Sequence, residues 1–230
     1  MAVNLPDPAA KAAVVAAMFD RIAPRYDLMN RLLTFRLDQR WRRHTARLLG
    51  IGRGDVVLDL GCGTGDMCEI ARAAGARVIG VDFAARMLAG AHARGAADAL
   101  VRADAGRLPF RGGVATVVTS AFTLRNFTSI PVVLAEAARV LRPGGRLALL
   151  EVDEPRHRVL RWGHAFYFRR AVPFIGALLS DREAYAYLPQ STAYLPPEPG
   201  LLELIAAAGF RTARKHRLFG GVAQLLLGER

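Results

Sequence analysis

The sequence predicts an α/β fold with a mostly parallel sheet, and three observations support this prediction. From residue 55 onward, short apolar segments alternate with helical segments, a pattern typical of parallel strands joined by crossover helices. The strand-like segments are apolar on both sides, as in a sheet that helices cover on both faces. Near the end of the chain, two further strand-like segments flank Gly220 and Gly221, which predicts an antiparallel hairpin at one edge of the sheet.

The sheet is expected to contain seven strands, five from the alternating region and two from the hairpin. The strands are predicted at residues 55–60, 77–82, 99–103, 114–120, 145–151, 210–220 and 221–228. Helices are predicted in the same region at residues 66–74, 84–94, 130–141, 158–179 and 199–208. Residues 9–49 also show helical spacing, with breaks expected at Pro24, Asn30 and Asp38, and with Asp38 as an N-cap.

The length of 230 residues indicates a single domain covering residues 1–230. We divide it into a helical segment (1–50) and an α/β core (51–230) that contains a helical insertion at about 156–198. No apolar run reaches the roughly 18 residues of a spanning helix, and the N-terminus lacks the features of a signal peptide. Cys62 and Cys68 have neither disulfide-framework nor metal-site spacing. We therefore expect free thiols, no metal site and a cytoplasmic protein.

The net charge of +12 comes from thirty arginines and two lysines against twenty acidic residues. An excess of this size favours anionic partners, which leaves nucleic acid, a membrane surface and acidic substrates open. It is equally compatible with an arginine-rich composition whose side chains are merely solvated. The charge alone does not decide between these interpretations.

The stretch "VVLDLGCGTGDM" (56–67) runs from a predicted strand through three glycines into a predicted helix. Gly61, Gly63 and Gly65 permit a sharp turn and a close approach of backbone to ligand, because glycine has no Cβ. The helix that follows presents unpaired N–H groups, which favour a carboxylate or a phosphate. The G-x-G-x-G spacing differs from the G-x-G-x-x-G of dinucleotide sites.

Two aspartates follow the next two predicted strands and share an edge of the sheet with this glycine turn. Asp82 ends the second strand, 21 residues after Gly61, where a carboxylate can accept from both hydroxyls of a ribose. Asp104 follows the third strand, where it could accept from the exocyclic amine of an adenine. The alternative is that each aspartate only caps the helix after its strand.

The glycine turn and the two aspartates together resemble the S-adenosylmethionine site of class I methyltransferases, which have a Rossmann-like fold. The resemblance implies S-adenosylmethionine as the cofactor, a ligand without a pyrophosphate. The residues that it implies around the cofactor are Tyr26, Asp59, Gly61, Cys62, Gly63, Thr64, Gly65, Asp82, Phe83, Asp104, Ala105 and Ala121.

Two segments outside this region resemble the ubiquinone/menaquinone biosynthesis C-methyltransferases, namely "FDRIAPRYDLMN" (19–30) and "AFTLRNF" (121–127). The resemblance covers about residues 18–228 and implies methylation of a ring carbon of a polyprenyl quinol. It also implies that the N-terminal helices form a lid over the cofactor. The lid residues that it marks are Phe19, Tyr26, Asp27 and Asn30.

The same resemblance implies that Arg125 and Asn126 face the acceptor ring as catalytic residues. Arginine stays protonated and cannot be a conventional base, so we expect Arg125 to stabilise a developing phenolate and to orient a water. The alternative is a loop pair that caps a helix or pairs at the surface. Thr123 and the acidic pair 153–154 depart from the family pattern near the expected acceptor pocket.

A quinol with an isoprenoid tail resides in a membrane, which implies peripheral contact with the bilayer. The segment "RHRVLRWGHAFYFRR" (156–170) has arginines at both ends and aromatic residues between them, as in an interfacial helix on anionic lipid. The alternative is that these aromatic residues pack inward over the acceptor pocket. Both arrangements are compatible with a helix that lines a channel for the tail.

Two other functions remain open from the sequence. One is methylation of a soluble phenol or another small molecule, and the other is nucleic-acid binding on the same fold. We expect no nucleic-acid partner, because the arginines are spread along the chain and no Asn/Asp-Pro-Pro-aromatic motif is present. The compact chain resembles the menaquinone branch more than the ubiquinone branch, which favours demethylmenaquinol as the acceptor. The sequence leaves a monomer and a homodimer equally open.

Overall fold

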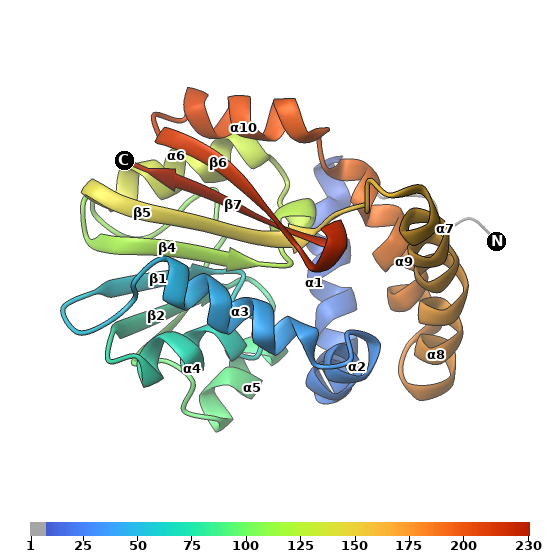
Figure 1. The fold of residues 1–230 in the computed structure, drawn as a ribbon. Coiled ribbons are helices and arrows are strands. Elements are labelled where there is room, and N and C mark those ends of the chain that lie inside the picture. The colour runs from blue at the N-terminus through green and yellow to red at the C-terminus, as the bar shows by residue number, and fades with distance from the viewer. Residues whose placement is uncertain (1–7) are drawn as a thin grey trace.

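The sheet has seven strands in the order β3-β2-β1-β4-β5-β7-β6 in the computed structural model, which describes residues 8–230 (Figure 1). The strands are β1 (Val56–Leu60), β2 (Arg77–Asp82), β3 (Ala99–Arg102), β4 (Ala115–Ala121), β5 (Leu141–Val152), β6 (Arg211–Leu218) and β7 (Ala223–Glu229). Strands β1 to β5 are parallel, whereas β7 is antiparallel to both β5 and β6. The predicted sheet and hairpin are confirmed, although β5 begins at Leu141 rather than at residue 145.

Helices cover both faces of this sheet (Figure 1). On one face, α6 (Ile130–Val140) and α10 (Glu198–Ala207) pack their apolar side chains against the strands. On the other face lie α3 (Leu37–Leu48), α4 (Asp66–Ala73) and α5 (Ala85–Ala93). Because both faces are covered, the central strands β1 and β4 are buried along nearly their whole length instead of alternating between buried and exposed residues.

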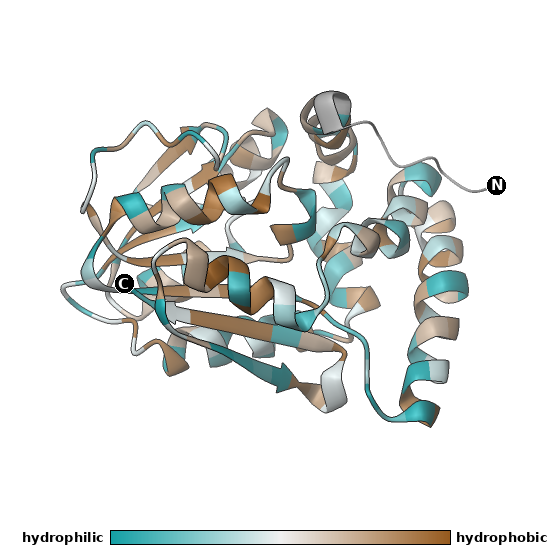
Figure 2. Cartoon of the chain, turned by 90° about the horizontal axis from the view of Figure 1, so that it is seen from above, coloured by the Kyte–Doolittle hydropathy of each residue, from teal (hydrophilic) through white to brown (hydrophobic). Residues whose placement is uncertain are grey.

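The edge strand β6 differs from the inner strands in its composition. Its sequence, "RTARKHRL", is mostly charged and half-exposed or exposed, and Figure 2 shows it as hydrophilic beside hydrophobic neighbours. Charged residues on an edge strand discourage pairing with another chain. The basic residues of the hairpin therefore protect the open edge of the sheet.

A second group of helices stands beyond the carboxyl ends of the parallel strands (Figure 1). These helices are α1 (Pro8–Ile22), α2 (Tyr26–Leu33), α7 (Arg158–Phe166), α8 (Val172–Leu179) and α9 (Arg182–Ser191). A five-residue π-helical segment, Tyr167–Ala171, joins α7 to α8. Helices from both halves of the chain share one apolar cluster, which includes Met18, Met29 and Tyr185. No helix within residues 8–230 has the length and apolar character needed to span a bilayer.

The breaks between the N-terminal helices differ from the prediction at two of three positions. The break at Pro24 is present as a 3₁₀ turn, but α2 continues through Asn30. The chain reverses instead at Phe35 and Arg36, both with positive φ, and Arg36 is the N-cap of α3. Asp38 lies inside α3 and accepts a hydrogen bond from Thr34 Oγ1 at 2.7 Å. The left-handed turn carries neither glycine nor proline, so its sequence gave no signal.

Strands β1 and β4 are neighbours at the centre of the sheet, and their connections leave in opposite directions. Such a switch point opens a crevice at the carboxyl ends of the strands, where α/β proteins bind ligands. The glycine turn follows β1 and the segment carrying Arg125 follows β4. The fold therefore brings the two predicted halves of the site to the same crevice.

Candidate functional site

The turn between β1 and α4 has the backbone conformation that its glycines predict. Gly61, Gly63 and Gly65 all have positive φ, at +67°, +57° and +93°. A Cβ on Gly61 would lie 2.3 Å from the Cγ2 atom of Thr123, so a larger residue would displace the segment after β4. Gly65 is the N-cap of α4. The turn therefore needs glycine both for its conformation and for its close packing.

Asp82, the last residue of β2, fastens this turn to the neighbouring strand. Its Oδ2 accepts from the backbone N–H of Gly63 at 2.8 Å, and its Oδ1 accepts from Ala84 at 2.9 Å. Burial raises the pKa of Asp82 above its ordinary value, and the backbone N–H groups oppose that rise. The N-cap of α5 is Ala84, and α5 has no side-chain cap hydrogen bond, so Asp82 orients the residue before the helix instead of capping it. Each carboxylate oxygen still has a lone pair for a ligand.

A narrow cleft opens beside Asp82 at the carboxyl ends of β1, β2 and β3. Its walls include Gly61, Asp82, Phe83, Asp104, Ala105, Asn126 and, from α1, Ala12. Asp104 is exposed, and its Oδ1 accepts from the backbone N–H of Gly106 at 2.7 Å. Carboxylates on adjacent strands beside a glycine turn fit the hydroxyls and the amine of an adenosine.

The volume of the cleft, about 70 Å³, is small for such a ligand. Sites for small molecules and cofactors usually measure about 300 to 1,000 Å³. Helix α1 forms part of the cover, since Ala12 lines the cleft. A bound nucleoside would need more room than the cleft offers here, and α1 is one of the elements that limit this room.

Several residues predicted around the cofactor lie next to the cleft rather than along it. Asp59 lies within the sheet, where it accepts from Thr119 Oγ1 at 2.7 Å and from Cys68 Sγ at 3.5 Å. Burial raises the pKa of Asp59 to about 6. Thr64 donates to Asp27 Oδ1 at 2.5 Å and so ties the turn to α2. A direct role of Asp59 and Thr64 in cofactor binding stays a prediction.

The remaining predicted residues occupy three different positions. Cys62 and Cys68 are buried free thiols, as predicted, and both sulfurs border Gly80 of β2. Ala121 ends β4 and is buried in the apolar cluster below the turn. Tyr26 begins α2 and forms an edge-to-face pair with Phe19, with ring centroids 5.9 Å apart.

A larger cavity of about 440 Å³ lies on the other side of Tyr26. Helices α1, α2, α3, α7 and α9 contribute to its wall together with the turn between β6 and β7. Its lining is rich in aromatic rings, which come from Phe19, Tyr26, Phe35, Trp41, Phe122, Tyr167, Phe168, Tyr187 and Phe219. A small space of about 20 Å³ lies between the cleft and this cavity; it shares Phe19, Tyr26, Phe122 and Asn126 with the cavity and Gly61, Asp82, Phe83 and Asn126 with the cleft. The cleft and the apolar cavity therefore meet at Asn126, and we call this place the junction.

Arg125 and Asn126 lie at this junction, in a short 3₁₀ turn that follows β4. Both side chains are buried. Arg125 forms an ion pair through Nη1 with Glu151, and its Nε donates to Ser191 Oγ at 3.1 Å. Asn126 Oδ1 accepts from the hydroxyl of Tyr187 at 3.4 Å. The structure contradicts the alternative of a surface loop pair, because both residues line the cavity.

Glu151 is a residue of the site that the sequence analysis did not identify. It is fully buried at 0% exposure near the end of β5. Besides the ion pair, its carboxylate accepts from the backbone N–H of Arg125 at 3.3 Å and from its own neighbour Val152 at 2.9 Å. It therefore fixes the orientation of the guanidinium. Its place at the carboxyl end of a central strand, like that of Asp82, was the signal that could have found it.

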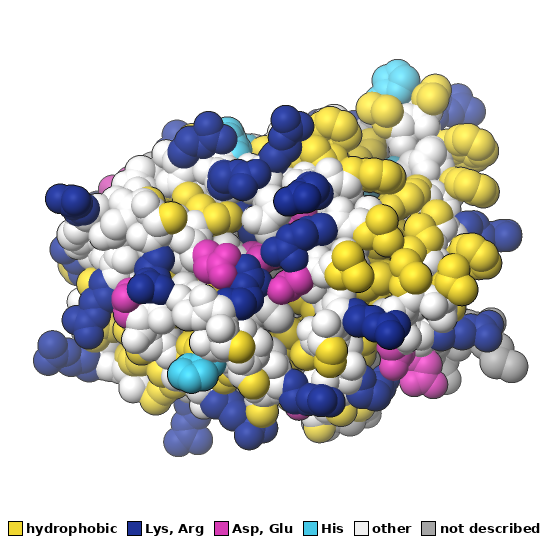
Figure 3. Space-filling view, turned by 90° about the horizontal axis from the view of Figure 1, so that it is seen from below, with side chains coloured by type: hydrophobic (Ala, Val, Ile, Leu, Met, Phe, Trp, Pro, Cys, Tyr) yellow, Lys and Arg dark blue, Asp and Glu magenta, His cyan; other side chains and the backbone are white. Residues whose placement is uncertain are grey.

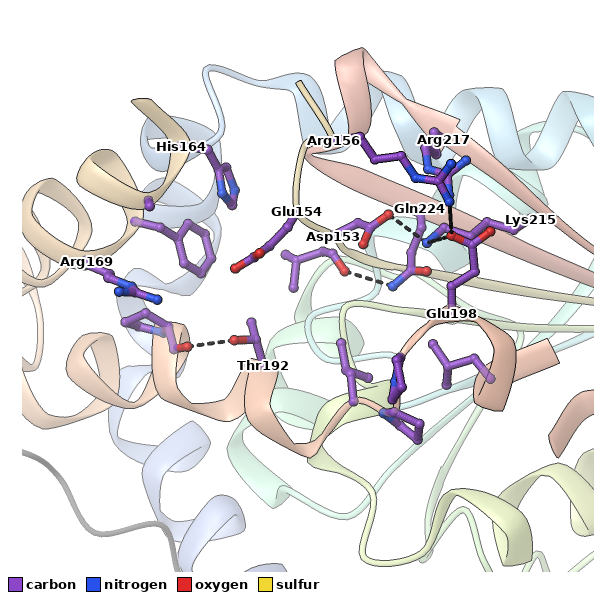
Figure 4. Close-up of a pocket in the computed structure, with 18 residues that line it drawn as sticks. Asp153, Glu154, Arg156, His164, Arg169, Thr192, Glu198, Lys215, Arg217 and Gln224 are labelled. Atoms are coloured by element: carbon purple, nitrogen blue, oxygen red, sulfur yellow. Dashed lines mark hydrogen bonds and ion pairs between the residues drawn. The ribbon is translucent and has the colours of Figure 1, made fainter. Parts of the chain in front are cut away.

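The acidic pair Asp153 and Glu154, expected near the acceptor pocket, lines a separate polar cavity of about 410 Å³ (Figure 4). Lys215 lies between two carboxylates there, with Nζ 2.8 Å from Asp153 Oδ2 and 3.4 Å from Glu198 Oε2. Val152, His164 and Phe168 line this cavity and the apolar one. The acidic pair therefore lies next to the apolar cavity, as expected, but does not line it.

The aromatic residues of the segment 156–170 divide into exposed ones and inward-facing ones. Trp162 on α7 is 74% exposed, and Phe166 is exposed beside it. Tyr167 and Phe168 turn inward and line the apolar cavity. Figure 3 shows a broad group of hydrophobic side chains on the surface of this helical half, with basic residues around it.

Comparison with known proteins gives consistent results. Residues 8–230 match the ubiE/COQ5 methyltransferase family. The chain is similar to the demethylmenaquinone methyltransferase of Thermus thermophilus, with 44% identity over 93% of this chain and 100% of that protein. It is also similar to the ubiquinone/menaquinone biosynthesis C-methyltransferase UbiE of Geobacter sulfurreducens, with 40% identity over 93% of this chain and 87% of that protein.

Solved structures with a similar fold are more distant in sequence. A putative S-adenosylmethionine-dependent methyltransferase from Methanococcus maripaludis aligns with a TM-score of 0.66 at 14% identity, covering 100% of this chain and 97% of that chain. A methyltransferase from Aquifex aeolicus aligns with a TM-score of 0.60 at 16% identity, covering 82% of this chain and 88% of that chain. These similarities confirm the predicted fold class.

Proposed function

The chain belongs to the ubiE/COQ5 methyltransferase family, and from this premise we propose that it methylates a ring carbon of demethylmenaquinol, giving menaquinol. S-adenosylmethionine is the methyl donor. The observation that carries the proposal is the junction of the cleft, which contains the carboxylates of Asp82 and Asp104, with the apolar cavity; Asn126 lines both. A nucleoside and an apolar ring can meet at this one place. Relatives named demethylmenaquinone methyltransferase support the naphthoquinol ring as the acceptor.

The residues at the cleft fit the cofactor. When bound, S-adenosylmethionine supplies an electrophilic methyl group. The residues of the chain have only to bind and orient this cofactor. We assign the free lone pairs of Asp82 to the ribose hydroxyls and Asp104 to the adenine amine. Phe19 and Tyr26 present aromatic rings at the junction, where they favour a positive sulfonium.

The acceptor ring must become electron-rich enough to react at carbon. A phenolic hydroxyl has a pKa of about 10 in water, and an apolar cavity raises it further. Burial has this effect on the hydroxyls in the wall, where it raises the pKa of Tyr187 to about 12. A fixed positive charge opposes this effect, because it stabilises the phenolate.

Arg125 supplies that positive charge at the junction. Glu151 and Ser191 hold the guanidinium in one orientation, so little reorganisation is needed when charge develops on the ring oxygen. A pre-oriented donor of this kind contributes about 3 kcal/mol to a transition state. Asn126, held by Tyr187, is placed to offer a second hydrogen bond.

We further propose that the mouth of the apolar cavity contacts a membrane. Phe35 and Phe219 line the cavity, yet they are 74% and 68% exposed. Both have positive φ, an uncommon and costly conformation for a bulky residue. Val159 and Leu160 of α7 are exposed beside them at the same mouth. Two strained turns and one helix thus present apolar side chains at the mouth, where the isoprenoid tail of a bound quinol would leave the cavity.

The charges around this mouth favour an anionic bilayer as the contact. Arg36 follows Phe35 directly, and Arg158 and Arg161 flank the exposed residues of α7; all three are exposed. Basic residues close to anionic lipid contribute about 1 kcal/mol each. Peripheral contact at this surface would let the acceptor enter without leaving the membrane.

The direct test is a methyl-transfer assay with labelled S-adenosylmethionine on three acceptors. These are demethylmenaquinol in anionic vesicles, the corresponding benzoquinol, and a soluble naphthol. We expect transfer to demethylmenaquinol and carbon-methylated menaquinol as the product by mass spectrometry. Transfer to the soluble naphthol with none to demethylmenaquinol would overturn the proposal.

A further inference from the structure

The two lysines of this arginine-rich chain are both buried. Thirty arginines stand beside only Lys11 and Lys215. Lys215 lies between the carboxylates of Asp153 and Glu198 (Figure 4), as expected for a buried cation. Lys11, on α1 and only 4% exposed, points its ammonium at uncharged groups instead. This unusual environment suggests a function beyond packing.

Within the part of the chain that the structure describes, Lys11 contacts two carbonyls beside Asn126 and one aromatic ring. Its Nζ donates to the carbonyl oxygen of Arg125 at 3.0 Å and to that of Phe127 at 2.7 Å. It also lies 3.7 Å from the ring centroid of Tyr194. The two carbonyls flank Asn126, so one ammonium orients the peptide groups on both sides of a residue at the junction.

This geometry explains why a lysine stands here. An ammonium is compact and has three donors in a tetrahedral arrangement, which suits two carbonyls and a ring face around one atom. A guanidinium is larger and planar, and its donors point in fixed directions. Burial disfavours the charge and lowers the pKa of Lys11 to about 8. The position therefore carries an energetic cost that an apolar residue would avoid.

The place of Lys11 in the fold connects it to the cofactor. The next residue, Ala12, lines the cleft, whose volume of about 70 Å³ is small for a nucleoside, so movement of α1 would make room for one. Movement of α1 away from the strand ends would also take the ammonium from both carbonyls, and its return would restore both hydrogen bonds.

We propose that Lys11 is a positioning residue that couples closure of α1 over the cofactor to the geometry of the Arg125–Asn126 turn. The acceptor side of the site is then complete only when the cofactor is enclosed. This inference rests on the proposed function for its catalytic consequence. The coupling between α1 and the turn can be measured without turnover.

The first experiment measures hydrogen exchange in residues 122–128 with and without S-adenosylhomocysteine. In the wild type, we expect the ligand to slow exchange in α1 and in the turn together. In Lys11→Met, which keeps the length of the side chain, we expect slowing in α1 but less than half of the wild-type slowing in the turn. Equal slowing of the turn in both proteins would overturn the proposal, whatever the acceptor is.

The second experiment separates kcat from cofactor affinity in the methyl-transfer assay. We expect Lys11→Met to lower kcat by at least about tenfold, since small misplacements of catalytic groups cost this much or more. The Kd for S-adenosylhomocysteine should stay within about threefold of wild type. Lys215→Met is the matched control, a buried lysine remote from the turn, and should lower the melting temperature without this loss of kcat.

The remaining outcomes also decide the question. If Lys11→Met lowers kcat, cofactor affinity and melting temperature together, Lys11 is only structural and the proposal fails. If that variant does not fold, Lys11→Arg replaces it, and we expect a smaller loss of kcat at unchanged cofactor affinity. An unchanged kcat in Lys11→Arg would then overturn the proposal. An inactive wild type that still shows coupled exchange would refute the proposed acceptor and leave the coupling intact.

Discussion

The cofactor cleft and the acceptor cavity are built from different parts of the molecule. The cleft lies at the ends of parallel strands, and its key groups follow one another within residues 61–105. The cavity is enclosed by helices and turns from residues 18–42, 122–126, 152–191 and 219–222. The sheet therefore provides a fixed frame for the nucleoside, whereas the acceptor site depends on contacts between segments far apart in the chain.

This difference separates a site whose geometry is set by the sheet from a site whose geometry is set by helix packing. Strand ends hold the aspartates in place through backbone hydrogen bonds, as at Asp82. Helix packing sets the size and the polarity of the cavity, and it can change without disturbing the sheet. The two halves share the turn that carries Arg125 and Asn126, so changes there should affect the reaction most.

The largest effect is expected for Arg125→Ala at the junction. Loss of a pre-oriented positive group should lower kcat by more than about 100-fold, while affinity for S-adenosylhomocysteine stays near wild type. The variant also leaves the buried Glu151 without its partner and should be less stable. Steady-state kinetics and calorimetric titration measure the two effects.

A double variant separates the loss of the Arg125 charge from the loss of stability that an unpaired Glu151 would cause. Arg125→Gln with Glu151→Gln removes both buried charges, so its melting temperature should lie above that of Arg125→Ala. The kcat of the double variant should be as low as that of Arg125→Ala. Near-normal turnover in the double variant would show that the guanidinium is not part of the mechanism, and that the junction is only a place where the halves pack.

A smaller effect, on the free energy of unfolding, is expected from the titration of Asp59, a buried residue of β1 near the cleft. Its pKa of about 6 in the folded chain exceeds the ordinary value of 3.8, because burial disfavours its charge. The stability from holding this proton is present below about pH 4 and is lost as pH rises through about 6. Between pH 4 and pH 8 this costs the wild type about 2 kcal/mol of unfolding free energy.

The variant Asp59→Asn lacks this titration. We expect its unfolding free energy relative to wild type to rise between pH 4 and pH 8, as measured by urea denaturation at several pH values. A constant difference at every pH would contradict the raised pKa. Since Asp59 is part of the sheet, the change should appear in global unfolding.

The smallest effect is expected at the mouth of the cavity. Phe35→Ser with Phe219→Ser should weaken binding to anionic vesicles by about tenfold, since each ring loses apolar area that the bilayer would bury. Turnover of a short-tailed, water-soluble quinol should stay near wild type. Co-sedimentation with vesicles gives the binding constant.

Leu48→Ser is the control for that variant. Leu48 is also exposed, but it lies at the far end of α3 from the cavity. Its replacement should leave vesicle binding unchanged. If the control and the double variant weaken binding equally, the membrane contact is not confined to the mouth.

Much of the sheet and of the cleft could be predicted because their signals are local. Continuous apolar strands, a turn of three glycines and aspartates at strand ends each occupy a few neighbouring residues. Arg125 and Asn126 were placed through their resemblance to a family motif. The structure confirms that both are buried beside a cavity.

The apolar cavity was less predictable from the sequence, because it is formed by contacts between residues far apart in the chain. The reversal at Phe35 and Arg36 has no glycine or proline to mark it; backbone hydrogen bonds close the turn, among them Arg36 N–H to the Arg31 carbonyl at 2.8 Å. The pairing of Glu151 with Arg125 joins the ends of two strands, and neither residue indicates its partner. Lys11 lies 114 positions from the carbonyl it binds, a separation that no sequence pattern spans.

The turn between β6 and β7 has a consequence for the order in which the protein is made. Phe219 and Val222 close the apolar cavity opposite Met18, so its two sides come from opposite ends of the chain. The strands that form the cleft are synthesised before residues 219–222, which complete the wall of the apolar cavity. A nascent chain can therefore assemble the proposed donor side while the proposed acceptor side is still open.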